Sequence, residues 1–101
     1  MRYFKLEEFD SPDEPGSGSN MHEEILHMLD VVRKKYGKPI KINSGYRTVD
    51  RNKKIGGVKN SSHLKGLAVD ISCKESKDRF ILLNLLIEVG FRRIGIAKSF
   101  I

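Results

Sequence analysis

The stretch from Ser61 to Asp70, SSHLKGLAVD, contains a histidine and an aspartate seven positions apart, with Gly66 and Ala68 between them. Imidazole nitrogen and carboxylate oxygen are both good zinc ligands. A catalytic zinc ion usually takes three protein ligands and leaves one position for water. His63 and Asp70 are therefore candidates for two ligands of such a site, which is an indication and not a complete site. The alternative interpretation is a turn into a buried strand with a polar residue at each end.

The side chains of His63 and Asp70 can meet only if the chain turns between them. The residues from Leu67 to Ser72 alternate between large apolar and small or polar side chains, which is the period of a half-buried strand. Gly66 permits a turn before this strand, and Ala68 leaves open space beside Asp70. We predict that the two ligating atoms lie within roughly 5 Å of each other, because both would bond one ion at about 2 Å.

Other polar residues are candidates for supporting roles. Arg47 lies in the turn SGYRT after a predicted strand, where its guanidinium could hold a carboxylate or stabilise an oxyanion. A surface salt bridge is the alternative for this residue. His22 and His27 are five positions apart on a predicted helix and do not share a face, so we expect helix-surface or interhelical roles for them and not metal binding. Ser61 is an ordinary loop residue unless a site lies next to it.

Two helices are expected to support these residues. Asn20 and Glu23 have capping-box spacing, and apolar residues then recur at helical spacing until Gly37. A second helix is predicted over 77–89, capped by Ser76, and its apolar run FILLNLLIEV indicates burial on more than one side.

The strands are expected to be short. PIKIN (39–43), the alternating stretch at 67–71 and FRRIGI (91–96) read as strands, and VDRNKK (49–54) reads as one or two helical turns. The segment 11–19 is rich in proline, glycine and serine and is predicted to be a loop. The fold class is therefore α+β, a small antiparallel sheet packed with helices, in a single domain over residues 1–101.

Composition restricts the class of partner. The chain of 101 residues has 39% hydrophobic residues and a formal charge of +6, which favours polyanions such as nucleic acid or the bacterial cell wall. No zinc-finger spacing, aromatic-rich strand motif or dense basic stripe supports a nucleic-acid-binding protein. No apolar run spans a membrane and no start resembles a signal peptide, so we expect synthesis in a cytoplasm. Cys73 is the single cysteine and is expected to be a small buried residue.

The motif SSHLKGLAVD resembles the S-x-H-x-x-G-x-A-x-D signature of the zinc D-alanyl-D-alanine peptidases of bacteria and phages. These enzymes share a fold with the signalling domain of Hedgehog proteins. INSGYRT, Asn52 and GGV at 56–58 precede the motif in the family's order. The beginning and the EVGFRRIGI stretch look like the small phage endolysin-type branch, so the resemblance covers essentially the whole chain.

The resemblance implies roles for four residues. His63 and Asp70 match zinc ligands, Ser61 matches a substrate-holding position, and Arg47 matches the arginine that polarises the scissile carbonyl or steadies the oxyanion. The implied activity is zinc-dependent hydrolysis of peptide bonds next to D-alanine in peptidoglycan stem peptides, either as a carboxypeptidase or as an endopeptidase. The implied place of action is the bacterial cell wall, reached by phage-type release.

The sequence departs from the family's pattern at two places. Arg51 stands where the phage branch often has histidine. The sequence ends at Ile101, where the pattern continues into a strand with His-x-Asp or a similar motif that carries the third zinc ligand and a proton-transfer residue. We therefore expect a domain without its C-terminal strand, inactive by itself. The alternative is a non-catalytic wall-binding or structural module of the same fold.

Overall fold

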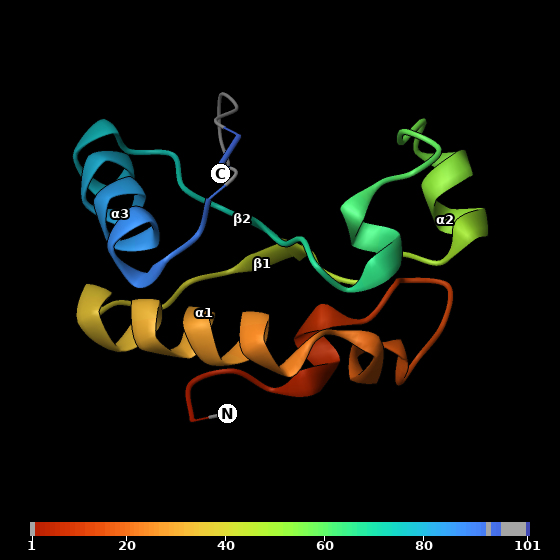
Figure 1. Ribbon diagram of the computed structural model, residues 1–101, viewed down its shortest axis with the longest axis horizontal. Helices are drawn as coiled ribbons and strands as arrows, with labels where there is room; N and C mark the ends of the chain where they lie inside the picture. Colours follow the sequence, from red (N-terminus) through yellow and green to blue (C-terminus); the bar gives the residue numbers. More distant parts are fainter. Residues whose placement is uncertain (1, 93, 96–100) are drawn as a thin grey trace.

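The computed structural model describes residues 2–92, 94–95 and 101 of the chain. These residues form three α-helices and a two-stranded antiparallel sheet, with short 3-10 helices between them (Figure 1). The elements follow in the order η1 (Leu6–Phe9), η2 (Ser17–Asn20), α1 (Glu23–Tyr36), β1 (Ile42–Ser44), α2 (Val49–Lys54), η3 (Ser62–Lys65), β2 (Asp70–Ile71) and α3 (Ser76–Val89). The predicted α+β class with a small antiparallel sheet is confirmed.

Helix α1 begins later than the sequence pattern indicated. Asn20 belongs to η2, and the N-cap of α1 is His22, whose side chain makes no capping hydrogen bond, so the predicted capping box is wrong. The backbone N–H of His22 instead donates to the carbonyl of Gly66 at 3.0 Å. The start of α1 is thereby fixed by the loop that carries His63. The helix ends at Gly37 as predicted, in a left-handed conformation with φ 76°.

Helices α1 and α3 pack against each other and enclose most of the core. Figure 1 places α3 beside the C-terminal half of α1, with α2 at the opposite end of the molecule. The ion pair Lys35–Glu88 at 2.8 Å links the two helices, and Lys38, just after α1, pairs with Asp78 of α3 at 2.7 Å. The buried apolar side chains come from both helices, the sheet and both ends of the chain: Phe4, Phe9, Met21, Leu26, Leu29, Val32, Ile40, Ile71, Cys73, Leu82, Leu86 and Ile101.

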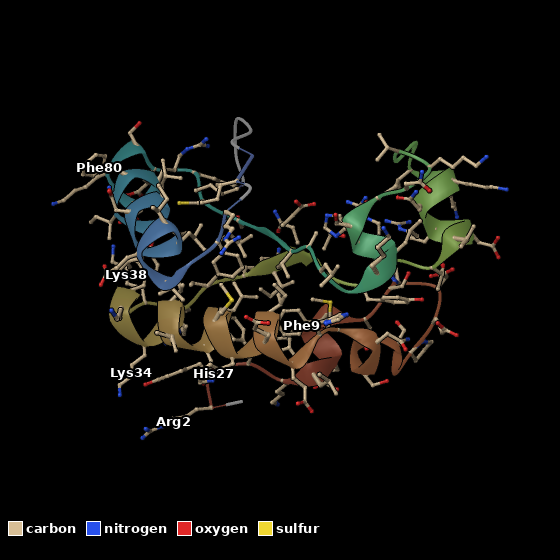
Figure 2. All side chains as sticks on the ribbon, viewed as in Figure 1. Arg2, Phe9, His27, Lys34, Lys38 and Phe80 are labelled. Atoms are coloured by element: carbon tan, nitrogen blue, oxygen red, sulfur yellow. The ribbon has the colours of Figure 1, made fainter. Side chains whose placement is uncertain are left out.

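Helix α3 buries one side only, so the prediction of burial on more than one side is wrong. Leu82 and Leu86 are buried against α1, whereas Phe80 is 70% exposed and Ile87 is 58% exposed. Figure 2 shows the Phe80 side chain at the outer surface. A continuous apolar run does not indicate which side of a helix is covered, because coverage depends on which other elements of the fold pack against it. Ser76 is the first residue of the helix rather than its cap, which is Glu75.

The sheet contains an irregularity that sets the direction of two polar side chains. Ile42 pairs with Ile71 and Ser44 with Asp70, so β1 has one extra residue between the two pairs. Such a β-bulge places Ser44, rather than Asn43, opposite Asp70. Directly paired residues of neighbouring strands project to the same face. The bulge therefore brings the hydroxyl of Ser44 and the carboxylate of Asp70 to one side of the sheet.

The strands are shorter than the sequence pattern predicted. β2 covers only Asp70–Ile71, and Leu67 is 43% exposed. Of the predicted third strand over 91–96, the described residues Phe91, Arg92, Ile94 and Gly95 are not in a strand, and residues 93 and 96 lie outside the described part.

The edge of β2 that faces away from β1 has a backbone partner. The N–H of Ile71 donates to the carbonyl of Ile101 at 2.8 Å, and the N–H of Ile101 donates back to the carbonyl of Ile71 at 2.9 Å.

Within the ranges described, no helix is long and apolar enough to cross a membrane.

The segment before α1 is tied to the turn before α2. The hydroxyls of Ser11 and Thr48 each donate to the Asp13 carboxylate at 2.5 Å, and the Thr48 N–H donates to Ser11 Oγ at 3.3 Å. Thr48 also caps α2 by accepting from the Arg51 N–H at 3.1 Å. The predicted loop at 11–19 therefore has a fixed conformation, with a bridge between Ser11 and Glu14.

This cluster predicts a pH-dependent contribution to stability. Hydrogen bonds from Ser11 and Thr48 hold the pKa of Asp13 below its ordinary value. A carboxyl group with a lowered folded pKa stabilises the protein above its unfolded pKa, and this stabilisation is lost as the pH falls through the folded pKa. We expect Asp13→Asn to lower the free energy of unfolding at pH 7, with the difference from wild type shrinking below about pH 4. Urea unfolding of wild type and Asp13→Asn at pH 7 and at pH 3 measures this difference in the free energy of unfolding.

The exposed Glu14→Gln provides the control, because the described contacts of Glu14 involve its backbone and not its carboxylate. A difference between Asp13→Asn and wild type that stays constant from pH 7 to pH 3 would contradict the assignment.

Candidate metal and substrate site

His63 is held in one orientation by the backbone around it. It lies in η3, where the side chain of Ser61 accepts a hydrogen bond from the His63 N–H at 3.2 Å. Its ring Nδ1 lies 2.7 Å from the carbonyl oxygen of Gly45. A carbonyl oxygen can only accept, so Nδ1 carries the proton of this bond. In the neutral ring, Nε2 is therefore the nitrogen with a free lone pair.

Nε2 of His63 faces the carboxylate of Asp70. The distance between His63 Nε2 and Asp70 Oδ2 is 3.5 Å, which confirms the predicted convergence of the two side chains. A neutral imidazole nitrogen and a carboxylate oxygen are both acceptors, and two acceptors at this distance attract each other only through a proton or a cation. The arrangement suits either a protonated histidine or a shared metal ion.

Two glycines allow the chain to make this arrangement. A Cβ atom on Gly66 would lie 2.2 Å from the Asn20 carbonyl oxygen, and the residue has φ 70°. A Cβ atom on Gly45 would lie 2.8 Å from Cα of Phe9. Both positions therefore require glycine. The loop that carries His63 runs against the backbone of Asn20 at Gly66, and the loop that carries its partner carbonyl runs against Phe9 at Gly45.

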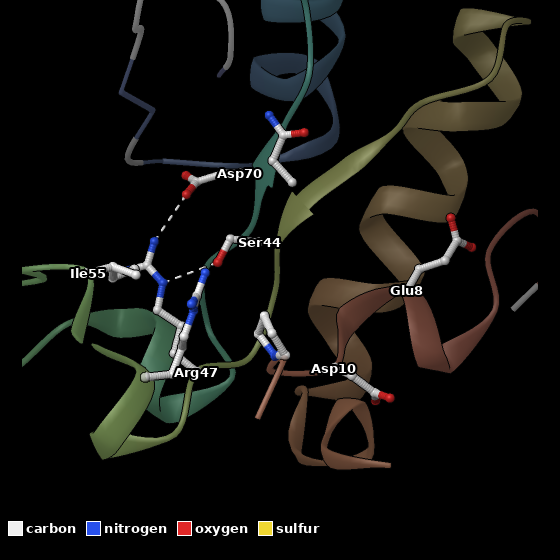
Figure 3. Close-up of a pocket in the computed structure, with 9 residues that line it drawn as sticks. Glu8, Asp10, Ser44, Arg47, Ile55 and Asp70 are labelled. Carbon is white, nitrogen blue, oxygen red and sulfur yellow. Dashed lines mark hydrogen bonds and ion pairs between the residues drawn. The ribbon is translucent and has the colours of Figure 1, made fainter. Parts of the chain in front are cut away.

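Arg47 connects the carboxylate to its surroundings. Its Nε donates to Ser44 Oγ at 3.1 Å and its Nη2 to Asp70 Oδ2 at 3.3 Å (Figure 3). Its Nη1 donates to Asn52 Oδ1 at 3.3 Å. The Arg47 side chain is 14% exposed. The Arg47 N–H donates to the carbonyl of His63 at 3.1 Å. Arg47 therefore bonds directly to one of the two candidate ligands and to the backbone of the other.

Asn52 is a site residue whose role sequence reasoning did not assign. It is 3% exposed, its Nδ2 donates to the Val58 carbonyl at 2.8 Å, and its Oδ1 accepts from Arg47. A Cβ atom on Gly57 would lie 2.1 Å from Asn52 Oδ1, so the glycine makes room for the amide. The available signal was an asparagine five residues after Arg47, followed by a glycine pair.

The site residues line two separate hollows that meet at Asp70. A cleft of about 260 Å³ includes Arg47, and a hollow of about 960 Å³ includes Ser61, His63 and Ala68. Asp70 lines both. Arg47 and His63 therefore line different hollows, but both face the same oxygen, Asp70 Oδ2, Arg47 through Nη2 at 3.3 Å and His63 through Nε2 at 3.5 Å.

The described residues provide two candidate metal ligands at this place. Across residues 2–92, 94–95 and 101, no group of three or more histidine, cysteine, aspartate or glutamate side chains could hold a metal ion. His22 and His27 are exposed, as predicted for surface roles. Cys73 is buried, as predicted, and burial raises the pKa of its thiol. His63 and Asp70 thus fit part of a zinc coordination sphere.

Comparison with known proteins identifies the family. The model of the Peptidase M15 family matches residues 2–100 of this chain. Searches of curated proteins and of solved structures give no significant match. The family match extends over nearly the whole length, from before η1 to beyond α3, and includes all four residues to which the resemblance gives roles. The chain therefore belongs to the Peptidase M15 family of peptidases.

Proposed function

We propose that this protein is a zinc metallopeptidase domain that acts on peptidoglycan stem peptides, at a bond next to D-alanine. The observation that carries the proposal is the contact of His63 Nε2 with Asp70 Oδ2 at 3.5 Å, with the ring fixed by the Gly45 carbonyl. Metal-bound histidines commonly donate their other ring nitrogen to a backbone carbonyl in this way. The pair is thus oriented for a cation without further rearrangement of the imidazole.

The residues around the pair have separable roles in this proposal. A zinc ion in such a site supplies Lewis-acid activation of water and of the scissile carbonyl. His63 and Asp70 would hold it, and Ser61, at the N-terminus of η3, would hold substrate in the larger hollow. Arg47 uses three of the five guanidinium N–H groups on Ser44, Asn52 and Asp70. The remaining two N–H groups are available to a developing oxyanion.

The family and the charge of the chain support the proposed substrate class. Peptidase family membership supports hydrolysis of peptide bonds. The formal charge of +6 favours an anionic surface such as the bacterial cell wall. We propose that the domain acts there after phage-type release, with stem peptides as its partner.

Zinc titration followed through histidine ring resonances by NMR tests the metal site. We expect the His63 resonances to shift on zinc addition and those of His22 and His27 to stay. His63→Ala and Asp70→Asn should each weaken zinc binding at least about tenfold, since a two-ligand site has few bonds to lose. The exposed His27→Ala is the matched control. Equal zinc affinity in wild type and His63→Ala would overturn the ligand assignment.

A non-catalytic wall-binding module is the second candidate function. The observation that favours it is the formal charge of +6, which suits an anionic wall without requiring any catalytic group. We expect the 101-residue chain to bind zinc weakly and to release no D-alanine from purified wall. A version extended by a strand with His-x-Asp should bind one equivalent of zinc and cleave. If neither version cleaves but both sediment with purified wall, the binding module is the better description.

A further inference from the structure

The cleft on the Arg47 side of Asp70 has charges on opposite walls. It has a volume of about 260 Å³, below the usual range for drug-sized ligands, and therefore suits a single side chain or head group. Arg47 and Asp70 lie on one side of it, and Glu8 and Asp10 on the other (Figure 3). Arg51, from α2, completes the basic wall.

The charge balance of the lining points to a ligand that carries both signs. Arg47 and Asp70 neutralise each other through their 3.3 Å ion pair. What remains is one cation, Arg51, and two carboxylates, Glu8 and Asp10. A bare carboxylate would meet a net negative lining, and a bare ammonium would leave the Arg51 guanidinium with no anion bonded to it, since its neighbour Asp13 is bonded to Ser11 and Thr48. A group with an ammonium and a carboxylate close together satisfies both walls.

The side chains that would contact such a group have free capacity. The structure gives the Arg51 guanidinium no hydrogen-bond acceptor among the described residues, although it lies near enough to Asp13 to lower the pKa of that carboxyl. Glu8 uses Oε2 to accept from the Lys5 N–H at 2.7 Å, which leaves Oε1 for a ligand. Asp10 accepts from the N–H groups of Gly16 and Gly18, so it contributes mainly negative potential.

The two walls are fixed relative to each other before a ligand arrives. Asp13 accepts a hydrogen bond from Ser11, which follows Glu8 and Asp10 in the same segment. It also accepts one from Thr48, which caps α2, the helix that carries Arg51. The Tyr46 N–H donates to the Phe9 carbonyl at 2.9 Å and joins the same two segments. A preformed cleft of this kind loses little entropy on binding.

We propose that this cleft binds a zwitterionic amino-acid head group of the substrate peptide, with Arg51 on its carboxylate and Glu8 on its ammonium. The proposal rests on the proposed function, since it assigns the neighbouring substrate residue to this cleft. Glu8 and Arg51 thereby act as specificity residues. They select stem peptides whose third residue ends in both charged groups over peptides with an ammonium alone.

Four synthetic peptides of sequence L-Ala-γ-D-Glu-X separate the two contacts. X is diaminopimelate, which carries both groups, lysine with the ammonium, 2-aminopimelate with the carboxylate, or norleucine with neither. Binding to the full chain is measured by amide NMR shifts without added metal. We expect the diaminopimelate peptide to bind at least about tenfold more tightly than each of the other three.

Two variants assign the preference to residues. Glu8→Gln keeps an acceptor for the Lys5 N–H and should remove only the advantage of the ammonium, while Arg51→Gln should remove only that of the carboxylate. Glu7→Gln, on the same 3-10 helix, and Lys54→Gln, on the same α-helix, are exposed matched controls and should change neither. Amide spectra of all four variants establish that they are folded.

Equal binding of the four peptides, or shifts confined to residues outside the cleft, would overturn the proposal. So would an unchanged peptide preference in folded Glu8→Gln and Arg51→Gln. Because these measurements need neither zinc nor turnover, they are independent of the zinc titration of His63. A peptide preference without zinc binding would support the cleft assignment and overturn the metallopeptidase proposal. Zinc binding by His63 without a peptide preference would overturn the cleft assignment and leave the metallopeptidase proposal in place.

Discussion

Replacing Gly66 with alanine is expected to lower the free energy of unfolding by about 3 kcal/mol or more. The residue has φ 70°, which disfavours any side chain, and its Cβ would lie 2.2 Å from the Asn20 carbonyl oxygen and 2.9 Å from Met21 Cα. Both are backbone atoms, so neither can turn aside. The displaced loop also carries the carbonyl that accepts from the His22 N–H at the start of α1. Urea unfolding monitored by circular dichroism measures the effect.

Gly56→Ala separates the collision from the backbone conformation. Gly56 has nearly the same φ, 73°, but no atom lies within 4 Å of its Cβ position. We expect this variant to lose only about 1 kcal/mol, the cost of a left-handed conformation for alanine. The excess loss in Gly66→Ala is then the cost of the contact with the Asn20–Met21 backbone. Similar losses in the two variants would show that this contact is looser than the distances indicate.

Arg47→Ala is expected to lower turnover by about 10²–10³ while zinc content stays near that of the parent. The experiment uses a zinc-loaded form of the domain that shows turnover. Arg47 contacts Asp70 Oδ2 but is not itself a ligand, so its removal leaves His63 Nε2 and the Asp70 oxygens in place. Its two uncommitted N–H groups would act only as charge develops on the substrate. Steady-state kinetics and metal analysis of the same preparation give both quantities.

Arg47→Lys sharpens the interpretation, because lysine keeps the charge but cannot reach Ser44, Asn52 and Asp70 together. We expect it to lose most of the turnover that Arg47→Ala loses. Lys54→Gln, an exposed change on α2, is the control for altered surface charge. If Arg47→Ala loses zinc in proportion to turnover, the residue holds the site together and does not stabilise the transition state.

The convergence of His63 and Asp70 could be predicted from the sequence because its causes are local. A glycine that permits a turn and an alternating stretch lie between the two residues and bring them close, although the distant Gly45 carbonyl sets the orientation of the His63 ring. The end of α1 at Gly37 was predictable for the same reason. The roles of Gly45 and Asn52 were not assigned, because the Gly45 carbonyl meets a histidine 18 residues later and the Asn52 amide joins two separate loops.

The incorrect predictions concern features that depend on tertiary neighbours. The start of α1 is set by the Gly66 carbonyl instead of the Asn20 side chain, and no local pattern contains that contact. The apolar run of α3 predicted burial all round, but only the side of Leu82 and Leu86 meets α1. The extra residue in β1 places Ser44 opposite Asp70, and a bulge of this kind depends on how the two strands pair.

The hydrogen bond between His63 Nδ1 and the Gly45 carbonyl has a consequence for how this site can change by mutation. Every amino acid has a backbone carbonyl, so no codon change at position 45 deletes the acceptor that orients the imidazole. A side chain at position 45 would instead collide with Phe9, so a substitution there would affect the site by displacing the backbone. The ring orientation is thus protected from single substitutions that remove an acceptor. Single substitutions abolish the candidate metal pair most directly by replacing His63 or Asp70 itself.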